Sequence, residues 1–272
     1  MTVRAASPSR RATVGSVEKA VSLLKILGDG APEAGVSELA RRLNVHKSTV
    51  SRLLATLERQ GLVERNPDTE KYRLGFELVR LAGRVPRHAE LVETAQPALE
   101  ALSQATGETI NLALPDDEQV INIYQISSRH LVKDSNWAGR RTPYHCAANG
   151  KALLAWLPEA EALRRLPARL QRFTANTLTS RADLLRDLAQ ARQQGFAVAR
   201  EELEIGLIAI AAPVRDTSGE GVAAVSVSGP AYRLTPDRVA ELGRLTAAAA
   251  EEISTRIGWS GVRKTQDVKR TA

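Results

Sequence analysis

The strongest constraint on the fold of this chain is a helix-turn-helix pattern over about residues 36–55. Two segments with helical spacing of apolar residues meet at the turn Asn44-Val45. The second segment is apolar on one face, and its other face carries hydroxyl groups and cations: Lys47, Ser48, Thr49, Ser51 and Arg52. Such a helix suits the major groove of DNA. The pattern therefore predicts a DNA-binding domain with these five residues as candidate contacts.

Two short strand patterns follow this segment and predict a β-hairpin. Residues 62–65 and 71–74 flank the turn-forming sequence Asn-Pro-Asp-Thr-Glu at 66–70. A further helical pattern precedes the helix-turn-helix, with apolar residues at Val17, Ala20, Val21, Leu24 and Leu27. Three helices followed by a hairpin make a winged helix, which we assign to residues 13–75. The cations of the hairpin are candidate phosphate contacts: Arg65, Lys71 and Arg73.

The distribution of charge agrees with this interpretation. The net charge is +7, and residues 1–90 hold 16 Lys and Arg against 10 Asp and Glu, which is +6. Residues 91–272 hold 22 against 21, which is +1. A cationic surface attracts phosphates in a salt-dependent way. An ordinary solvated basic surface is the alternative, and the helix-turn-helix pattern beside it favours the DNA interpretation.

The rest of the chain divides into four segments by its pattern. Residues 1–12 are predicted to be a disordered basic arm, and residues 76–90 a linker helix whose wide apolar stripe should pack on something, a second copy being one candidate. Residues 91–257 alternate strands with flanking helices, which predicts an α+β sensor-like domain. Residues 258–272 are predicted to be a mobile tail.

Composition limits the compartment and the chemistry. The single cysteine, Cys146, leaves no internal disulfide and favours a reducing compartment. No apolar run approaches the roughly 20 residues that span a bilayer, and the N-terminus lacks a signal-peptide core. We therefore expect a cytoplasmic protein without a membrane partner. The four histidines show no metal-ligand spacing, so neither a metal nor a cofactor is expected.

Four blocks in order along the chain resemble the IclR-type transcriptional regulators. They are Ser-Thr-Val-Ser-Arg-Leu-Leu at 48–54 with the hairpin sequence, His-Cys-Ala-Ala-Asn-Gly-Lys at 145–151, Glu-Glu-Leu-Glu-Ile-Gly-Leu at 201–207, and Ser-Val-Ser-Gly-Pro at 226–230. The resemblance spans roughly residues 13–257. It implies an N-terminal winged helix-turn-helix and a C-terminal GAF-like α/β effector-binding domain.

The resemblance also implies how such a protein works. Members bind palindromic operators in double-stranded DNA as homodimers or dimers of dimers, which suits helix-turn-helix geometry. They respond to a small organic effector, often a carboxylate or an aromatic acid. We therefore expect a repressor or dual regulator of a catabolic operon rather than an enzyme, and RNA polymerase is a further candidate partner.

Seven residues are carried over to the effector site by motif: Ala148, Asn149, Gly150, Leu207, Ala209, Ser226 and Ser228. Gly150 is expected to begin a helix whose free N–H groups favour an anion. The serines share one face of a strand and could bind a carboxylate, or could instead bond to neighbouring backbone. One position departs from the pattern. Ala199 stands where relatives often carry an aspartate, and Arg200 follows it.

The alternative function is a small-molecule enzyme or carrier with an accessory DNA-binding domain. Its chemical centre would be His145-Cys146, a candidate nucleophile and base. The sequence offers no third orienting residue, and a lone cysteine among alanines is typical of a core. The pair Gly150-Lys151 also fails the phosphate-loop pattern, because Ala152 stands where Ser or Thr is required.

Overall fold

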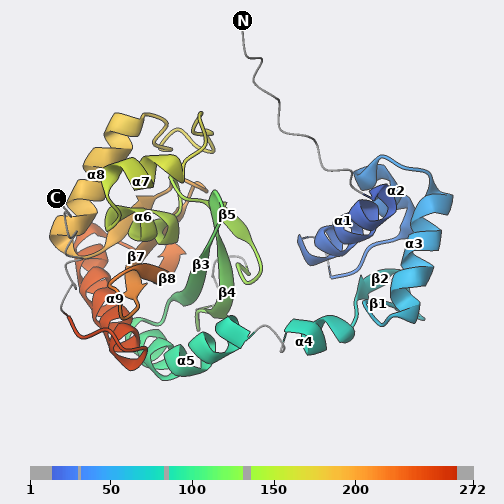
Figure 1. The fold of residues 1–272 in the computed structure, drawn as a ribbon, viewed down its shortest axis with the longest axis horizontal. Coiled ribbons are helices and arrows are strands. Elements are labelled where there is room, and N and C mark those ends of the chain that lie inside the picture. The colour runs from blue at the N-terminus through green and yellow to red at the C-terminus, as the bar shows by residue number, and fades with distance from the viewer. Residues whose placement is uncertain (1–13, 30–31, 83–85, 131–135, 262–272) are drawn as a thin grey trace, which may run out of the picture. The chain divides into compact units, whose positions relative to one another are not determined.

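The structure is a computed structural model that describes residues 14–29, 32–82, 86–130 and 136–261. The chain forms two compact units, Met1–Pro86 and Arg87–Ala272 (Figure 1). The basic arm predicted over 1–12 and most of the tail predicted over 258–272 lie outside the described residues. Within the described ranges, none of the helices combines the length and the apolar character needed to cross a membrane.

The N-terminal unit is a three-helix domain followed by a two-stranded sheet, as the sequence predicts. Its helices pack through apolar side chains that recur at helical spacing, and Leu23, Leu39 and Leu54 are fully buried where the three helices meet. The elements are α1 (Gly15–Asp29), α2 (Val36–Leu43), α3 (Lys47–Arg59), β1 (Val63–Arg65), β2 (Tyr72–Leu74) and α4 (Glu77–Ala82).

The turn of the helix-turn-helix depends on Asn44. Its backbone is left-handed, with φ 53° and ψ 48°, and its N–H points back to the carbonyl groups of Ala40 and Arg41. Asparagine tolerates this conformation better than most residues, and the geometry ends α2 sharply. Helix α3 then begins at Lys47 with His46 as its N-cap residue.

The hairpin forms as predicted. Strands β1 and β2 pair antiparallel, with Val63 opposite Leu74. The hairpin is tied to the helices by Ala34, whose N–H donates to the Tyr72 carbonyl at 2.9 Å and whose carbonyl accepts from the Tyr72 N–H at 2.9 Å. This bridge fixes the wing on the three-helix domain.

The linker predicted as one helix over 76–90 consists of two helical segments. The first is α4, and the second is the beginning of α5 (Pro86–Thr106). Proline suits the first turn of a helix, where its missing N–H needs no partner, and α5 starts at Pro86.

The C-terminal unit is built on a six-stranded antiparallel sheet in the order β5-β4-β3-β8-β7-β6. Helices cover both faces of this sheet (Figure 1). Its elements are β3 (Thr109–Asp116), β4 (Gln119–Ile126), β5 (Arg141–Pro143), α6 (Ala148–Ala155), α7 (Glu159–Arg164), α8 (Arg181–Gln194), β6 (Ala197–Arg200), β7 (Leu207–Arg215), β8 (Gly221–Pro230) and α9 (Pro236–Arg256).

The two faces of the sheet carry side chains of different size. Large residues such as Ile110, Ile210 and Val227 pack against α5 and α9. Their neighbours along the strands point the opposite way and are small, for example Ala211 and Ala224, which pack beside α6 and α8. These small side chains leave room between the sheet and α6, and the candidate pocket lies there.

Candidate functional site

The recognition helix α3 presents the predicted DNA contacts on its outward face. Lys47, Ser48, Ser51 and Arg52 are exposed, and Thr49 is half-buried. The opposite face of the same helix is buried in the core through Val50, Leu54 and Leu57. The helix is thus held from behind, and its hydroxyl and cationic groups are available to a ligand. Their assignment as DNA contacts stays a prediction.

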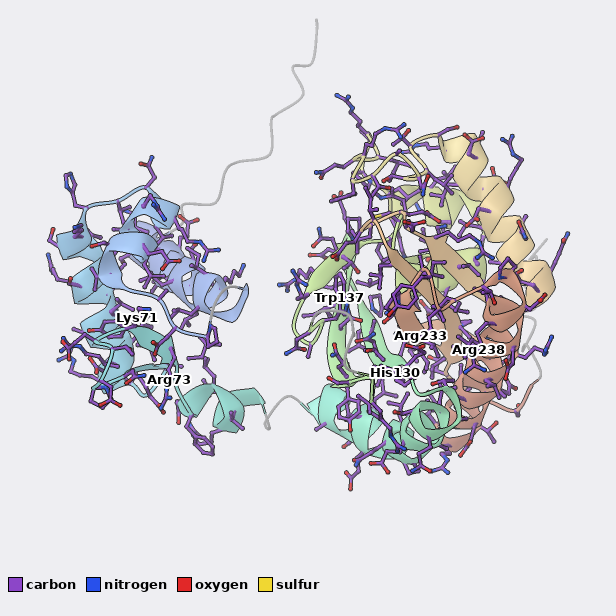
Figure 2. The ribbon with its side chains drawn as sticks, turned by 180° about the vertical axis from the view of Figure 1, so that it is seen from behind. Lys71, Arg73, His130, Trp137, Arg233 and Arg238 are labelled. Carbon is purple, nitrogen blue, oxygen red and sulfur yellow. The ribbon has the colours of Figure 1, made fainter. Side chains whose placement is uncertain are left out.

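The wing carries two of its predicted cations in ion pairs. Arg73 contacts Glu64 across the hairpin at 3.1 Å, and Arg65 pairs with Glu70 beside the turn. Lys71 is exposed, and the described part of the chain shows no ion pair to it. Figure 2 shows Lys71 and Arg73 on this hairpin. The wing therefore has less unbalanced positive charge than the sequence suggests, with Lys71 its least engaged cation.

A polar pocket lies between α6 and the small-residue face of the sheet. The space that its walls leave free of protein atoms is about 470 Å³, part of it open to solvent. The lining residues are Asn111, Asn122, Trp137, Thr142, Cys146, Ala147, Ala148, Asn149, Ala199, Glu202, Leu203, Glu204, Leu207, Ala209, Ser226 and Ser228.

The pocket brings together six of the seven residues carried over to the effector site. Ala148 and Asn149 come from the start of α6, and the other four, Leu207, Ala209, Ser226 and Ser228, come from β7 and β8. Alternate residues of each strand share the pocket face, which is the reason for the spacing of the serines. Ser228 Oγ accepts from Asn111 Nδ2 at 3.4 Å.

Gly150 is the seventh residue, and the structure gives it a packing role. Its Cα lies against the backbone of Tyr144, and a Cβ there would approach the Tyr144 carbonyl oxygen to 2.5 Å. Gly150 is outside the set of described residues that line the pocket. Its small size lets α6 approach the strand end at β5, which brings Ala148 and Asn149 to the wall.

Five buried polar atoms at the pocket have no hydrogen-bond partner within the described structure. They belong to lining residues and make up five of the seven such side-chain atoms: Asn111 Oδ1, Trp137 Nε1, Thr142 Oγ1, Asn149 Oδ1 and Glu202 Oε2. Buried polar groups are nearly always hydrogen-bonded in native proteins, and an unsatisfied one costs roughly 1–3 kcal/mol. Because five such atoms belong to residues that line one pocket, this pocket is the candidate site for a polar ligand.

Sequence reasoning missed several of these lining residues. Asn111 and Asn122 lie on β3 and β4, where a polar residue inside an apolar strand was the available signal. Thr142 lies in β5, and Trp137 lies in the loop before it. This strand has only three residues, which are too few to show a periodicity in the sequence. Trp137 is held at the wall by its backbone N–H, which donates to Gln125 Oε1 at 2.7 Å, and by Arg140 over its ring.

Lys151 is fully buried and forms a structural charge cluster. Its Nζ donates to Glu202 Oε1 at 2.6 Å and to the Val198 carbonyl at 3.0 Å, and it lies 3.0 Å from Asp187 Oδ2. Burial raises the pKa of the Glu202 carboxyl, and Lys151 opposes this shift. The lysine thus joins α6 to the strand β6 and the loop after it, which explains the Gly-Lys pair without a phosphate.

The structure shows where Ala199, which departs from the family pattern, and the following Arg200 lie. Ala199 lines the pocket, whereas Arg200 is exposed and does not line it. Among the described lining residues there is no lysine, arginine or histidine. The charged side chains of the described lining are therefore two glutamates, Glu204 and Glu202, of which Glu202 pairs with the buried Lys151.

The pair His145-Cys146 is not arranged as a nucleophile and base. His145 Nε2 lies 2.8 Å from the Gln171 carbonyl oxygen. Burial raises the pKa of the Cys146 thiol to about 12, so the thiolate is scarce at neutral pH. Burial also lowers the pKa of His145. The geometry supplies no activated nucleophile here.

A winged helix-turn-helix unit in one chain with an α+β unit that encloses a polar pocket defines a two-domain DNA-binding regulator. Comparison with protein families is in agreement. Residues 16–67 match the IclR helix-turn-helix domain, and residues 84–255 match the C-terminal domain of the bacterial transcriptional regulator IclR. The chain belongs to the IclR family of transcriptional regulators, and it is not an enzyme.

Individual relatives agree over nearly the whole chain. The transcriptional regulator KdgR of Escherichia coli K12 is 36% identical over 248 residues, which cover 91% of this chain and 94% of KdgR. The crystal structure of Thermotoga maritima IclR matches with a TM-score of 0.75 at 30% identity, over 90% of this chain and 99% of that one. An IclR homologue from Microbacterium hydrocarbonoxydans, complexed with 4-hydroxybenzoate, matches with a TM-score of 0.74 at 28% identity, over 89% and 98%.

The substitution Gly150→Ala tests the packing role of this residue. We expect it to lower the free energy of unfolding by about 3 kcal/mol, because the added methyl group meets the Tyr144 backbone, which cannot rotate away. Gly221→Ala is the matched control, since its nearest contact would be a flexible Leu153 side chain at 3.4 Å. Urea unfolding measures both. Equal stability of the two variants would contradict the packing role.

Proposed function

We propose that this chain binds a palindromic operator as a homodimer and changes its affinity for that operator when a small organic molecule occupies the pocket beside α6. The observation that carries the proposal is the group of five unpartnered polar atoms at a pocket in a DNA-binding protein. A pocket used only for packing would be filled by apolar side chains instead. Such a regulator acts in the cytoplasm, where its DNA is.

The proposed DNA contacts divide into two groups by position. Lys47, Ser48 and Thr49 lie at the start of α3, where unpaired backbone N–H groups also favour phosphate. Ser51 and Arg52 lie further along the exposed face, where side chains reach base edges in the major groove. On the wing, Lys71 is the strongest candidate for phosphate, and Arg65 and Arg73 would first exchange their glutamate partners.

The variant Arg52→Ala tests the recognition helix. We expect specific operator binding to weaken by about 1–3 kcal/mol if Arg52 makes a bidentate contact to a guanine. Fluorescence anisotropy with operator and scrambled duplexes at several salt concentrations measures the effect. Arg186→Ala is the control, because it removes the same charge from an exposed position of the other unit. Equal weakening on both duplexes would assign Arg52 to phosphate, and no weakening on either would exclude it.

The proposed homodimer rests on apolar residues that the described structure leaves exposed in the N-terminal unit. On α4 and just before it, Phe76 is 74% exposed and Val79 is 62% exposed. On α1 and just before it, Val14, Val17 and Val21 are 64%, 58% and 43% exposed, and their spacing places them on one face. Exposed apolar stripes of this kind mark association surfaces. A second copy of the chain supplies an identical stripe and satisfies two-fold symmetry.

The variant Val79→Glu tests this surface. A charge buried in an apolar interface is costly, so we expect the dissociation constant of the dimer to rise by at least about tenfold. Sedimentation velocity at a series of protein concentrations measures it. Gln60→Glu adds the same charge at an exposed polar position of the same unit and should leave association unchanged. A dimer that tolerates glutamate at position 79 would contradict the assignment of α4.

The effector is proposed to be a small organic molecule with an anionic group at the start of α6. Ala147 is the N-cap residue of α6 and makes no side-chain cap hydrogen bond, and the start of a helix favours an anion. The relative that holds 4-hydroxybenzoate makes aromatic acids the first class to test. Because one relative is named a repressor, effector-controlled repression is the first mode to examine. RNA polymerase is a partner only if activation is observed.

The regulatory step is tested by linkage. We expect a compound that binds the pocket to change operator affinity by about 5- to 150-fold, the usual range of allosteric coupling. Anisotropy titrations with and without each compound of a small organic-acid panel measure this change. The control Ala209→Phe fills the pocket from β7 and should remove the response while operator binding persists. Pocket binding with unchanged operator affinity would contradict the proposal.

A further inference from the structure

The unpartnered atoms of the pocket differ in hydrogen-bond character. Trp137 Nε1 is a donor, and Thr142 Oγ1 can donate or accept. The other three are oxygens that accept: Asn111 Oδ1, Asn149 Oδ1 and Glu202 Oε2. All five side chains are buried, with exposures between 4% and 8%. The pocket therefore needs a partner that donates hydrogen bonds as well as one that accepts them.

A simple carboxylate meets only part of this need. Its oxygens can accept from Trp137, Thr142 and the first N–H groups of α6. A carboxylate has no proton to donate at neutral pH, so it would leave the acceptors closed in without partners. A site built to bond a hydroxyl or N–H group discriminates strongly against an analogue that lacks it.

Glu202 requires that the ligand donate a hydrogen bond to it. Its Oε1 already accepts from Lys151 Nζ at 2.6 Å and from the Arg200 N–H at 3.3 Å, whereas its Oε2 is buried without a partner. An ionised carboxylate can only accept. The neighbouring amides act with it, because Asn149 Nδ2 is engaged by Asn122 Oδ1 at 3.1 Å and Asn111 Nδ2 by Ser228 Oγ at 3.4 Å. Both amides thus leave their oxygens for the ligand.

We propose that the effector of this chain is a hydroxylated organic acid, and that Glu202, assisted by Asn111 and Asn149, selects it by accepting hydrogen bonds from its hydroxyl groups. The inference rests on the proposed function, since it concerns the same pocket. It narrows the chemical class of the effector, because the anionic end of the ligand would bind at the start of α6 while its hydroxyl groups face the acceptor oxygens. Carboxylates that carry no hydroxyl or other hydrogen-bond donor should bind weakly.

Matched pairs of acids test this selection on the full-length protein. The probes are 4-hydroxybenzoate with benzoate, glycerate with propanoate, and gluconate with hexanoate, each pair differing in hydroxyl groups. Isothermal titration calorimetry gives the dissociation constants. We expect the hydroxylated member of at least one pair to bind about tenfold more tightly or better, and no member without hydroxyls to exceed its partner.

Glu202→Gln locates the selection. Because Lys151 requires an oxygen, the amide nitrogen takes the Oε2 position and turns the acceptor into a donor. We expect the hydroxylated probe to lose about tenfold in affinity, while its partner without hydroxyls changes by less than about threefold. Asp187→Asn is the matched control, since Asp187 contacts the same lysine but does not line the pocket. It should keep the full preference.

A second variant covers the case in which Glu202→Gln does not fold, which thermal unfolding reveals. Asn111→Ala removes an acceptor from β3 without touching Lys151, and it should reduce the hydroxyl preference in the same direction. If the variants that fold, Glu202→Gln and Asn111→Ala, still bind the hydroxylated probe with the full preference, the assignment of the acceptors is overturned. Equal or tighter binding of the acids without hydroxyls, or failure of every hydroxylated probe to bind at millimolar concentration, would overturn the ligand class.

The two proposals can fail separately. Each probe that binds is also added to an operator titration. A hydroxylated probe that binds with the expected preference but leaves operator affinity unchanged supports the ligand class and contradicts the proposed regulation. A probe without hydroxyls that binds and shifts operator affinity supports the regulation and contradicts the ligand class.

Discussion

The difference in side-chain size between the two faces of the six-stranded sheet is the constraint on which the effector unit depends. Large residues such as Ile110 and Val227 pack under α5 and α9 and form an apolar core there. On the other face alanine, serine and asparagine leave a gap that α6 covers but does not fill. Close packing is the rule in protein interiors, so a gap lined by polar residues at this position is the site that we propose for the effector.

The buried Lys151 fixes the position of the Glu202 carboxylate, which lines the pocket. A lone charge in the interior would be strongly destabilising, so the lysine is surrounded by Glu202, Asp187 and the Val198 carbonyl. These partners come from α8, β6 and the loop after it, and the lysine comes from α6. The Lys151 cluster therefore holds α6, which covers the pocket, against the sheet and orients the Glu202 carboxylate at the pocket wall. Gly150 supports the same arrangement, because it lets α6 come close to Tyr144.

Much of the fold was predictable because its signals are local. Helical periodicity identified α2 and α3, and the turn sequence after Arg65 identified the hairpin. The errors were local as well. The linker predicted as one helix over 76–90 is divided between α4 and α5, because Pro86 begins a helix of its own, and short elements such as β5 and α7 have too few residues to reveal a period. The assignment of the chain to its family followed from the order of its motif blocks.

The sequence by itself determined the class of protein, the recognition helix with its exposed Lys47 and Arg52, and, through the family motifs, six of the sixteen residues that line the pocket. Only the tertiary structure decided which polar groups meet and which remain without partners. Asn111 reaches Ser228 across 117 positions and Lys151 reaches Glu202 across 51, so neither contact has a signal in any sequence window. The same holds on the wing, where Arg73 pairs with Glu64 on the facing strand. Local patterns encode secondary structure, whereas a binding site is a set of distances between distant residues that exists only after the chain has packed.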